Sequence, residues 1–264
     1  MKGFDFHRPA SVADAVAFLK GNDGAKLLAG GQSLLPVMKL DLAQPTDLVS
    51  LAKIAGLDEI RAEGDTLVIG ALATHDQVAT SADVKRLIPG LAKLAAGIGD
   101  PQVRNRGTLG GSLGHADPAA DYPAAVLALG ATIATDRRTI PADDYFTGLF
   151  QTALAADEIV TAVHFPVPKR SAYAKFAHPA SKYALVGVMV AKTGGGVRVA
   201  VTGAGSKAFR VPALEAALGA NFAPDAVPDG AVSTADVRSG SEASPEYLAH
   251  LATVMARRAV QACL

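Results

Sequence analysis

Two glycine pairs, each with hydroxyl side chains nearby, are the residues best suited to chemistry in this chain. The first pair lies in residues 28–34, with the sequence LAGGQSL, between two apolar runs. The second lies about 80 residues further along, in residues 107–112, with the sequence GTLGGS. Glycine lets the backbone come close to a ligand because no Cβ intervenes, and successive N–H groups can then converge on phosphate oxygens. We expect the two turns to grip one large phosphate-bearing cofactor.

Each turn also has an interpretation without a cofactor, because a Gly-Gly turn after a strand is often structural. Residues 110–114, GGSLG, satisfy the Gly-x-Ser-x-Gly pattern of a nucleophilic serine, so a serine hydrolase that uses Ser112 is an alternative. That pattern requires an apolar strand directly before it, whereas residues 104–108 read RNRGT. His115 and Asp117 suggest a metal, but the other histidines are scattered and complete no ligand set.

The elements that must position the first turn form a small α/β unit. We expect a helix over residues 11–21, strands at 26–29 and 47–51, and a short helix at 34–40. A hairpin over 60–70 turns at Gly64 and Asp65. Helices are then expected from Thr74 and over 89–96.

The second turn lies in residues 100–122, which are rich in glycine, aspartate and proline, and we expect a long functional loop there. A helix at 123–129 and strands at 131–135 and 158–165 should follow. Proline residues near 168 mark a boundary. Beyond it the pattern predicts an antiparallel sheet with a hairpin at 194–196, then helices at 212–218 and 245–263. The fold class is therefore α+β.

Composition excludes several classes of protein. The chain of 264 residues has 25 basic and 25 acidic side chains, so no net charge favours nucleic acid as a partner. Cys263 is the single cysteine, which leaves no ligand set for an iron–sulfur cluster in this chain. The longest apolar run, residues 184–191, is far shorter than the roughly 20 residues of a membrane span. The N-terminus has no signal-peptide pattern, and we expect a cytoplasmic protein.

Three motifs together carry a resemblance to a known family. Residues 29–36 (AGGQSLLP), 108–112 (TLGGS) and 115–124 (HADPAADYPA) resemble, in order and spacing, the FAD-binding medium subunit of the molybdenum hydroxylases, the group of carbon monoxide dehydrogenase and xanthine dehydrogenase. The resemblance covers essentially the whole chain. It implies a vanillyl-alcohol-oxidase-type FAD-binding domain at 1–168, with subdomains at about 1–55 and 56–168, followed by a C-terminal α+β domain at 169–264.

The resemblance also implies roles for particular residues. The backbone of residues 29–33 would wrap the FAD pyrophosphate, and Leu109 would pack near the isoalloxazine. Asp121 would accept hydrogen bonds from cofactor hydroxyls, or cap the helix that follows it. Lys175 would be a cation beside the flavin that favours its reduced anionic form, or a solvated lysine on an edge strand. Tyr183 would lie near the flavin face, or be a core tyrosine.

No catalytic or metal-binding residue is assigned in this chain. Arg104 and Arg106 have three interpretations: they meet the FAD phosphate, pair with aspartates of the loop, or face a partner subunit. Pairing with the aspartates is the first expectation. The cofactor-binding residues implied by the resemblance are Leu28, Ala29, Gly30, Gly31, Gln32, Ser33, Leu34, Thr108, Leu109, Gly110, Gly111, Ser112, Asp121, Val160, Lys175 and Tyr183.

The function that the resemblance implies is electron transfer. A large subunit with a molybdenum-pterin cofactor would oxidise the substrate, and a small subunit with two 2Fe-2S clusters would pass electrons to FAD in this chain. The acceptor is open between NAD, a quinone and oxygen. The complex is expected to be a heterotrimer, and the resemblance implies a dimer of such heterotrimers. A cofactor-free scaffold subunit is the second alternative, beside the hydrolase.

Overall fold

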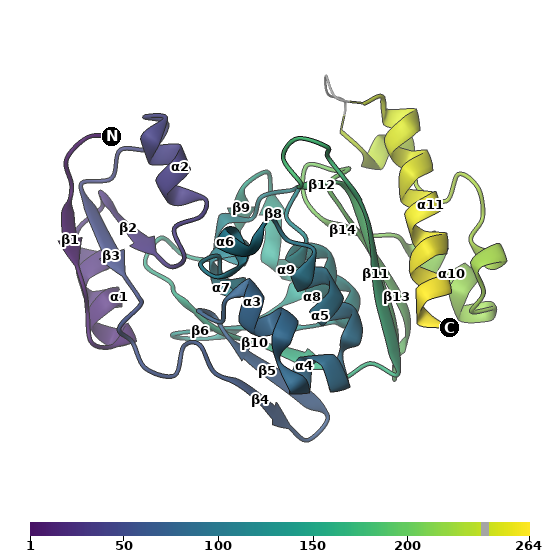
Figure 1. Ribbon diagram of the computed structural model, residues 1–264, viewed down its shortest axis with the longest axis horizontal. Helices are drawn as coiled ribbons and strands as arrows, with labels where there is room; N and C mark the ends of the chain where they lie inside the picture. Colours follow the sequence, from purple (N-terminus) through teal and green to yellow (C-terminus); the bar gives the residue numbers. More distant parts are fainter. Residues whose placement is uncertain (239–242) are drawn as a thin grey trace.

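The computed structural model describes residues 1–238 and 243–264. Figure 1 shows three units side by side: an N-terminal unit with the first glycine turn, a central unit with the second, and a C-terminal sheet with helices on its outer face. Each unit contributes a hydrophobic core of its own. The two glycine turns therefore belong to different units and can meet only across the boundary between them.

The N-terminal unit is a three-stranded parallel sheet in the order β1-β3-β2, formed by β1 (Asp5–His7), β2 (Ala25–Leu28) and β3 (Asp47–Ser50). Helices α1 (Val12–Gly21) and α2 (Leu34–Lys39) connect the strands. The Ser11 hydroxyl accepts the Asp14 N–H and so caps α1. The first glycine turn lies between the end of β2 and the start of α2, as the sequence predicted.

The central unit is an antiparallel sheet in the order β4-β5-β10-β6-β7, with helices on one face (Figure 1). The predicted hairpin over 60–70 is confirmed, and so is the Thr74 cap, which forms a capping box with Gln77. The strands are β4 (Ile60–Glu63), β5 (Thr66–Gly70), β6 (Thr132–Thr135), β7 (Thr139–Pro141) and β10 (Val160–Pro166). The helices are α3 (His75–Thr80), α4 (Ala82–Leu87), α5 (Pro89–Ala96), α6 (Pro101–Arg104), α7 (Leu109–His115), α8 (Tyr122–Leu129) and α9 (Ala142–Tyr145), and the small hairpin of β8 (Phe146–Gly148) and β9 (Gln151–Thr152) completes the unit.

The expected long loop at 100–122 is wrong, because the segment contains α6 and α7. The Asp100 carboxylate accepts the Val103 N–H, and the Thr108 hydroxyl accepts the Gly111 N–H, so each helix has a side-chain cap. The glycines of α7 allow close packing, since a Cβ on Gly110 would lie 2.5 Å from the Ala71 Cβ. Tertiary contact thus compensates for the low helix propensity of glycine. Helix α4 was also missed.

The C-terminal unit is an antiparallel sheet in the order β11-β12-β13-β14, as the sequence predicted. Both faces of β12 are buried: Val186, Val188 and Val190 face the outer core, whereas Met189 and Ala191 join the core of the central unit. The elements are β11 (Arg170–Ala177), β12 (Ala184–Thr193), β13 (Gly196–Thr202), β14 (Phe209–Arg210), α10 (Pro212–Ala220), α11 (Pro245–Cys263) and two short 3-10 turns, Pro224–Ala226 and Thr234–Asp236.

This sheet is shared between two layers of helices. Helices α5 and α8 of the central unit pack against its inner face, and α10 and α11 cover its outer face (Figure 1). The Ser244 hydroxyl accepts the Tyr247 N–H, which confirms the predicted cap of α11. Within residues 1–238 and 243–264, none of the helices combines the length and the apolar character needed to cross a membrane.

Candidate cofactor-binding site

The two glycine turns touch each other across the boundary between the first two units. A Cβ on Gly30 would overlap the carbonyl oxygen of Arg106 and would lie 2.9 Å from the Gly107 Cα. A Cβ on Gly111 would lie 3.5 Å from the Ala29 Cβ. Glycine is therefore required at position 30 by the close approach of two backbones. The structure brings residues 29–31 and 107–111 together, as the sequence suggested.

The first turn presents unpaired backbone donors. Among the hydrogen bonds of the described residues, the N–H groups of residues 30–34 have no protein acceptor, and α2 begins with the bond from Leu35 N–H to Gly31 O. Ser33 occupies the cap position of α2, but its hydroxyl makes no capping bond. Gly31 has a φ of 76°, which turns the chain sharply at this point. A run of unpaired N–H groups in such a turn is a site for phosphate oxygens.

The second turn differs, because the first three N–H groups of α7 are already bonded inside the protein. They bond as follows: Leu109 N–H to Ala73 O (3.0 Å), Gly110 N–H to Ala71 O (2.8 Å) and Gly111 N–H to Thr108 Oγ1 (3.1 Å). Gly107 O in turn accepts the His75 N–H at 2.9 Å. The second turn is therefore a rigid wall opposite the phosphate cradle and not a second set of free donors.

His75 lies directly beneath this wall, and sequence reasoning missed it. A Cβ on Gly107 would lie 2.5 Å from the His75 Nε2, and the imidazole is packed 5.3 Å from the Tyr122 ring. Burial, together with the charge of Arg104, lowers the pKa of His75 to about 4, so the ring is neutral near pH 7. The one sequence signal was its position next to the Thr74 cap, one residue from a helix start.

Asp121 is the centre of a buried polar cluster that joins the central and C-terminal units. Its carboxylate accepts the Tyr173 hydroxyl at 2.5 Å and lies 3.1 Å from the Lys175 ammonium, which also donates to Gly97 O at 2.9 Å. Burial raises the pKa of the Asp121 carboxyl, and the Lys175 charge and the Tyr173 hydrogen bond act against that rise. The two charges of the pair cancel locally.

These contacts test the interpretations without a cofactor for both residues, whose roles toward FAD stay predictions. Asp121 occupies the N-cap position of α8, as one interpretation predicted, but its side chain makes no capping bond. The Lys175 side chain is 12% exposed and ion-paired, so the solvated edge-strand interpretation is wrong. Tyr173, which the sequence did not single out, supplies the third member of the cluster.

The C-terminal sheet also holds the segment that leads to Asp121. The buried Thr202 hydroxyl lies 2.9 Å from Pro118 O and 2.6 Å from Ala120 O, within reach of both carbonyls. Two further backbone bonds, from Ala184 N–H to Ala119 O and from Gly203 N–H to Pro118 O, attach the same segment. The C-terminal unit is therefore part of the site's framework.

The remaining predicted contacts are placed as follows. Tyr183 is 44% exposed, so it is not a core tyrosine; its partial burial and the nearby charges of Asp117 and Asp121 raise its pKa. Leu109 and Val160 are both buried in the core of the central unit. Gln32 is exposed, whereas Leu28, Ser33, Leu34 and Ser112 are half-buried. The roles given to all these residues stay predictions.

The structure gives no support to the other chemistries. No histidine is hydrogen-bonded to Ser112 among the described residues, and His115 instead lies 5.2 Å from the Phe150 ring. Over residues 1–238 and 243–264 no group of three or more His, Cys, Asp or Glu side chains could hold a metal ion. Arg104 does not pair with aspartates as expected, since it donates to the carbonyls of Ile98 and Gly99.

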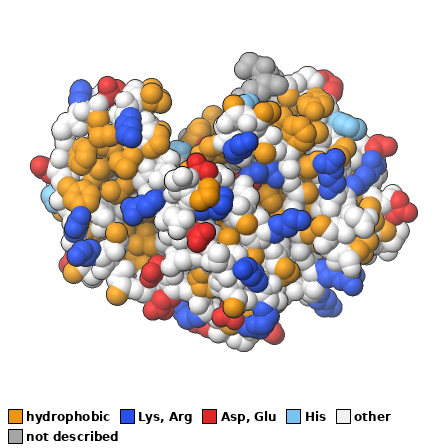
Figure 2. Space-filling view, viewed as in Figure 1, with side chains coloured by type: hydrophobic (Ala, Val, Ile, Leu, Met, Phe, Trp, Pro, Cys, Tyr) orange, Lys and Arg blue, Asp and Glu red, His pale blue; other side chains and the backbone are white. Residues whose placement is uncertain are grey.

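Figure 2 shows a notch at the top of the view, between the N-terminal unit and the rest of the molecule, with apolar side chains gathered on the N-terminal side. A turn of unpaired N–H groups on the N-terminal unit, a glycine helix on the central unit and a polar cluster that joins the central and C-terminal units are together typical of a nucleotide-cofactor-binding protein. The unpaired N–H groups of residues 30–34 match the oxygens of a pyrophosphate, as an FAD would present them.

Comparison with known families agrees with this class. Residues 2–168 match the family described as the FAD binding domain in molybdopterin dehydrogenase. The chain belongs to this family, the FAD-binding medium subunits of the molybdenum hydroxylases, and is a flavoprotein subunit of an oxidoreductase.

Individual relatives are similar over nearly their whole length. The chain is 40% identical to the nicotine 6-hydroxylase medium subunit of Paenarthrobacter nicotinovorans, covering 90% of this chain and 81% of that one. It is 38% identical to the carbon monoxide dehydrogenase medium chain of Hydrogenophaga pseudoflava, covering 98% and 96%. A chain in a crystal structure of the Cu,Mo-CO dehydrogenase superposes with a TM-score of 0.92 at 35% identity, covering 100% and 98%.

Proposed function

We propose that this chain is the electron-transfer subunit of a heterotrimeric molybdenum hydroxylase. It would receive electrons from 2Fe-2S clusters in a small partner subunit and pass them through FAD to an external acceptor. A large partner subunit with a molybdenum-pterin cofactor would oxidise the substrate. The relatives named as medium subunits or chains support a multi-subunit complex, and the single cysteine of this chain leaves the clusters to a partner.

The observation that carries the proposal is the cradle of unpaired N–H groups at residues 30–34, facing a second glycine turn whose own donors are already used. Residues 29–33 would bind the pyrophosphate, and the wall at 107–111 would keep the cofactor in the notch. FAD, when bound, supplies one- and two-electron redox chemistry. The chain's own residues then bind and orient the cofactor, and the Asp121–Lys175 pair sets the charge at one side of the site.

We also propose the finer organisation that the resemblance implies. Residues 1–168 would form a vanillyl-alcohol-oxidase-type domain with its FAD between the N-terminal and central units. Residues 169–264 would be the C-terminal domain, and two heterotrimers would dimerise. The parallel sheet of the first unit and the antiparallel sheet of the second support a division into two subdomains.

Flavin reconstitution tests the proposal. The chain, purified with its partner subunits, should contain FAD at one per chain and show flavin absorbance. Gly30→Ala should abolish FAD binding, because the added Cβ would overlap the Arg106 carbonyl and separate the two turns. Gly114→Ala is the matched control, since a Cβ at this α7 glycine meets nothing within 4 Å. A complex without flavin would refute the proposal, and full flavin content in Gly30→Ala would remove the first turn from the site.

A further inference from the structure

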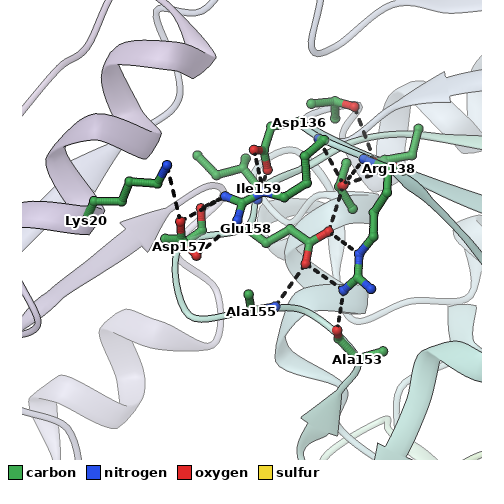
Figure 3. A network of polar contacts seen from close by, with 12 residues as sticks. Lys20, Asp136, Arg138, Ala153, Ala155, Asp157, Glu158 and Ile159 are labelled. Atoms are coloured by element: carbon green, nitrogen blue, oxygen red, sulfur yellow. Dashed lines mark hydrogen bonds and ion pairs between the residues drawn. The ribbon is translucent and has the colours of Figure 1, made fainter.

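A network of charged side chains lies at the edge between the N-terminal and central units, on segments outside the glycine turns (Figure 3). It joins the turn between β6 and β7, residues 135–138, to the segment that precedes β10, residues 155–159. We call these two segments the clasp. Figure 3 shows that Lys20 reaches toward it from α1 of the N-terminal unit.

Glu158 anchors the clasp inside the central unit. Its side chain is 1% exposed, and both carboxylate oxygens are bonded to Arg138, to Nε and Nη2, each at 2.8 Å. The Ala155 N–H and the Thr135 hydroxyl donate to the same carboxylate. A paired, bidentate carboxylate of this kind holds its segment in one place.

Asp136 binds the backbone N–H and the backbone C=O of Ile159, the residue that follows Glu158. The Asp136 carboxylate accepts the Ile159 N–H at 2.8 Å, and the Asp136 N–H donates to Ile159 O at 3.0 Å. Arg137 bridges the carboxylates of Asp136 and Asp157. Ile159 itself is 1% exposed, and its side chain belongs to the core of the N-terminal unit, although its backbone belongs to the central one.

The surface beside the clasp holds the two units together only weakly. A groove of about 630 Å³ separates one face of α1 from β6 and β10, with Val12, Val16 and Lys20 on one side and Asp136 and Thr161 on the other. Lys20 lies 3.9 Å from Asp157 across it. Because α1 is not packed against the sheet here, the contact between the units depends on the inserted Ile159, on Leu57 and Leu72 in the same core, and on the Lys20–Asp157 ion pair.

We propose that the clasp fixes the angle between the N-terminal and central units and thereby sets the width of the cofactor site, with Glu158 and Asp136 as positioning residues. This inference rests on the proposed function for its effect on FAD, but the geometry it describes can be measured without flavin. The glycine turns contact each other across the same boundary, so rotation about it would change the separation of cradle and wall.

The chain offers a matched pair of variants. Glu158→Gln breaks the bidentate pair with Arg138 in the clasp. Glu215→Gln breaks a bidentate pair with Arg210 in the C-terminal unit, and that carboxylate likewise accepts one backbone N–H, from Val199. Asp157→Asn is a milder clasp variant, because its side chain is 23% exposed. All three remove a charged acceptor without changing side-chain size.

Pulsed EPR on the assembled complex measures the distance between one spin label in each unit, which changes with the angle between the units. Spin labels are attached to the exposed positions Asp23→Cys and Asp65→Cys, one in each unit, in a Cys263→Ser background. We expect Glu158→Gln to broaden the distance distribution, Asp157→Asn to broaden it less, and Glu215→Gln to leave it unchanged. An unchanged distribution in both clasp variants would overturn the proposal, and so would equal broadening in Glu215→Gln.

FAD affinity is the second readout. If about one tenth of Glu158→Gln molecules keep the competent angle, the Kd for FAD rises about tenfold, because the apparent Kd is the intrinsic value divided by that fraction. Glu215→Gln should keep the wild-type Kd. A broadened distribution with unchanged FAD affinity would overturn the link to the site. Absence of FAD binding in the wild type would refute the proposed function alone, and the EPR result would still decide the clasp.

Discussion

Lys175 is ion-paired in the structure, whereas the sequence led us to expect an isolated cation beside the flavin. As an isolated cation it would favour the reduced, anionic flavin, but its ammonium lies 3.1 Å from the Asp121 carboxylate, and the two charges cancel. The Tyr173 hydroxyl bonded to the same carboxylate keeps Asp121 in place. If FAD binds beside this pair, as we propose, the pair would offer the flavin a neutral dipole.

Asp121→Asn should uncover the Lys175 charge and raise the flavin reduction potential. We expect a rise on the order of 30 mV, which corresponds to about 1.4 kcal/mol for a two-electron couple. Spectroelectrochemistry of the flavin-loaded complex measures it. The double variant Asp121→Asn with Lys175→Met removes both charges and should return the potential close to the wild-type value. An unchanged potential in flavin-loaded Asp121→Asn would place Lys175 too far from the ring to matter.

His75 gives the stability of the fold a defined pH dependence. Burial lowers its pKa from 6.5 to about 4, so the unfolded state binds a proton first as the pH falls. The contribution of neutral His75 to the free energy of unfolding is fully present above pH 6.5 and is lost as the pH falls from 6.5 to 4. Over about 2.5 pKa units this amounts to about 3 kcal/mol. Urea unfolding at several pH values should show the loss in the wild type, and its slope should be smaller in His75→Gln.

At the scale of elements, the position of Asp121 depends on hydrogen bonds between the segment before it and the C-terminal sheet. The segment before Asp121 is bonded to the ends of β12 and β13, through Ala184, Gly203 and the Thr202 hydroxyl. Thr202 is fully buried, so solvent cannot replace its hydroxyl. Thr202 of the C-terminal sheet therefore helps to hold residues 118–120 of the central unit in place.

Thr202→Val should destabilise the protein by about 1–3 kcal/mol, because the hydroxyl bond to Ala120 O would be lost, whereas Pro118 O would keep the Gly203 N–H as its donor. It should also weaken FAD binding, since Asp121 follows the released segment. Thr202→Ser keeps the hydroxyl and serves as the control. Thermal unfolding and FAD titration measure the two effects. A Thr202→Val protein as stable as Thr202→Ser would show that the hydroxyl does not anchor the segment.

At the scale of the whole molecule, the division at residue 168 is not a division between independent cores. Tyr173, Met189, Ala191 and Ala200 of the C-terminal sheet are buried in the core of the central unit, against α5 and α8. A chain that ends at residue 168 would expose this face. The domain boundary at residue 168 stays a prediction, and the shared core leads us to expect that residues 1–168 do not fold on their own.

The fragment of residues 1–168 should consequently fail to unfold cooperatively. We expect it to bind a hydrophobic dye and to lack a sharp thermal transition in circular dichroism, whereas the full chain shows one. It should not retain FAD, because Lys175, Tyr173 and Thr202 are missing. A cooperatively folded fragment with bound flavin would contradict the shared core.

Several elements could be predicted from local pattern because their signals are local. The hairpin over 60–70, the Thr74 capping box and the Ser244 cap of α11 each depend on neighbouring residues, and each is confirmed. Helix α7 was missed, because glycine argues against a helix and the packing of Gly110 on Ala71 is not visible in the sequence. Helix α6 was missed as well, and it is a single turn of four residues.

The sequence by itself determined the α+β class, the two glycine turns and the family to which they belong. The tertiary structure decided that residues 30–34 keep their N–H groups unpaired while those of residues 109–111 are used, and that Lys175 is neutralised by Asp121. The physical reason is that tertiary packing determines which residues distant in the chain come close enough to form a hydrogen bond or an ion pair. No local pattern of residue types contains that information.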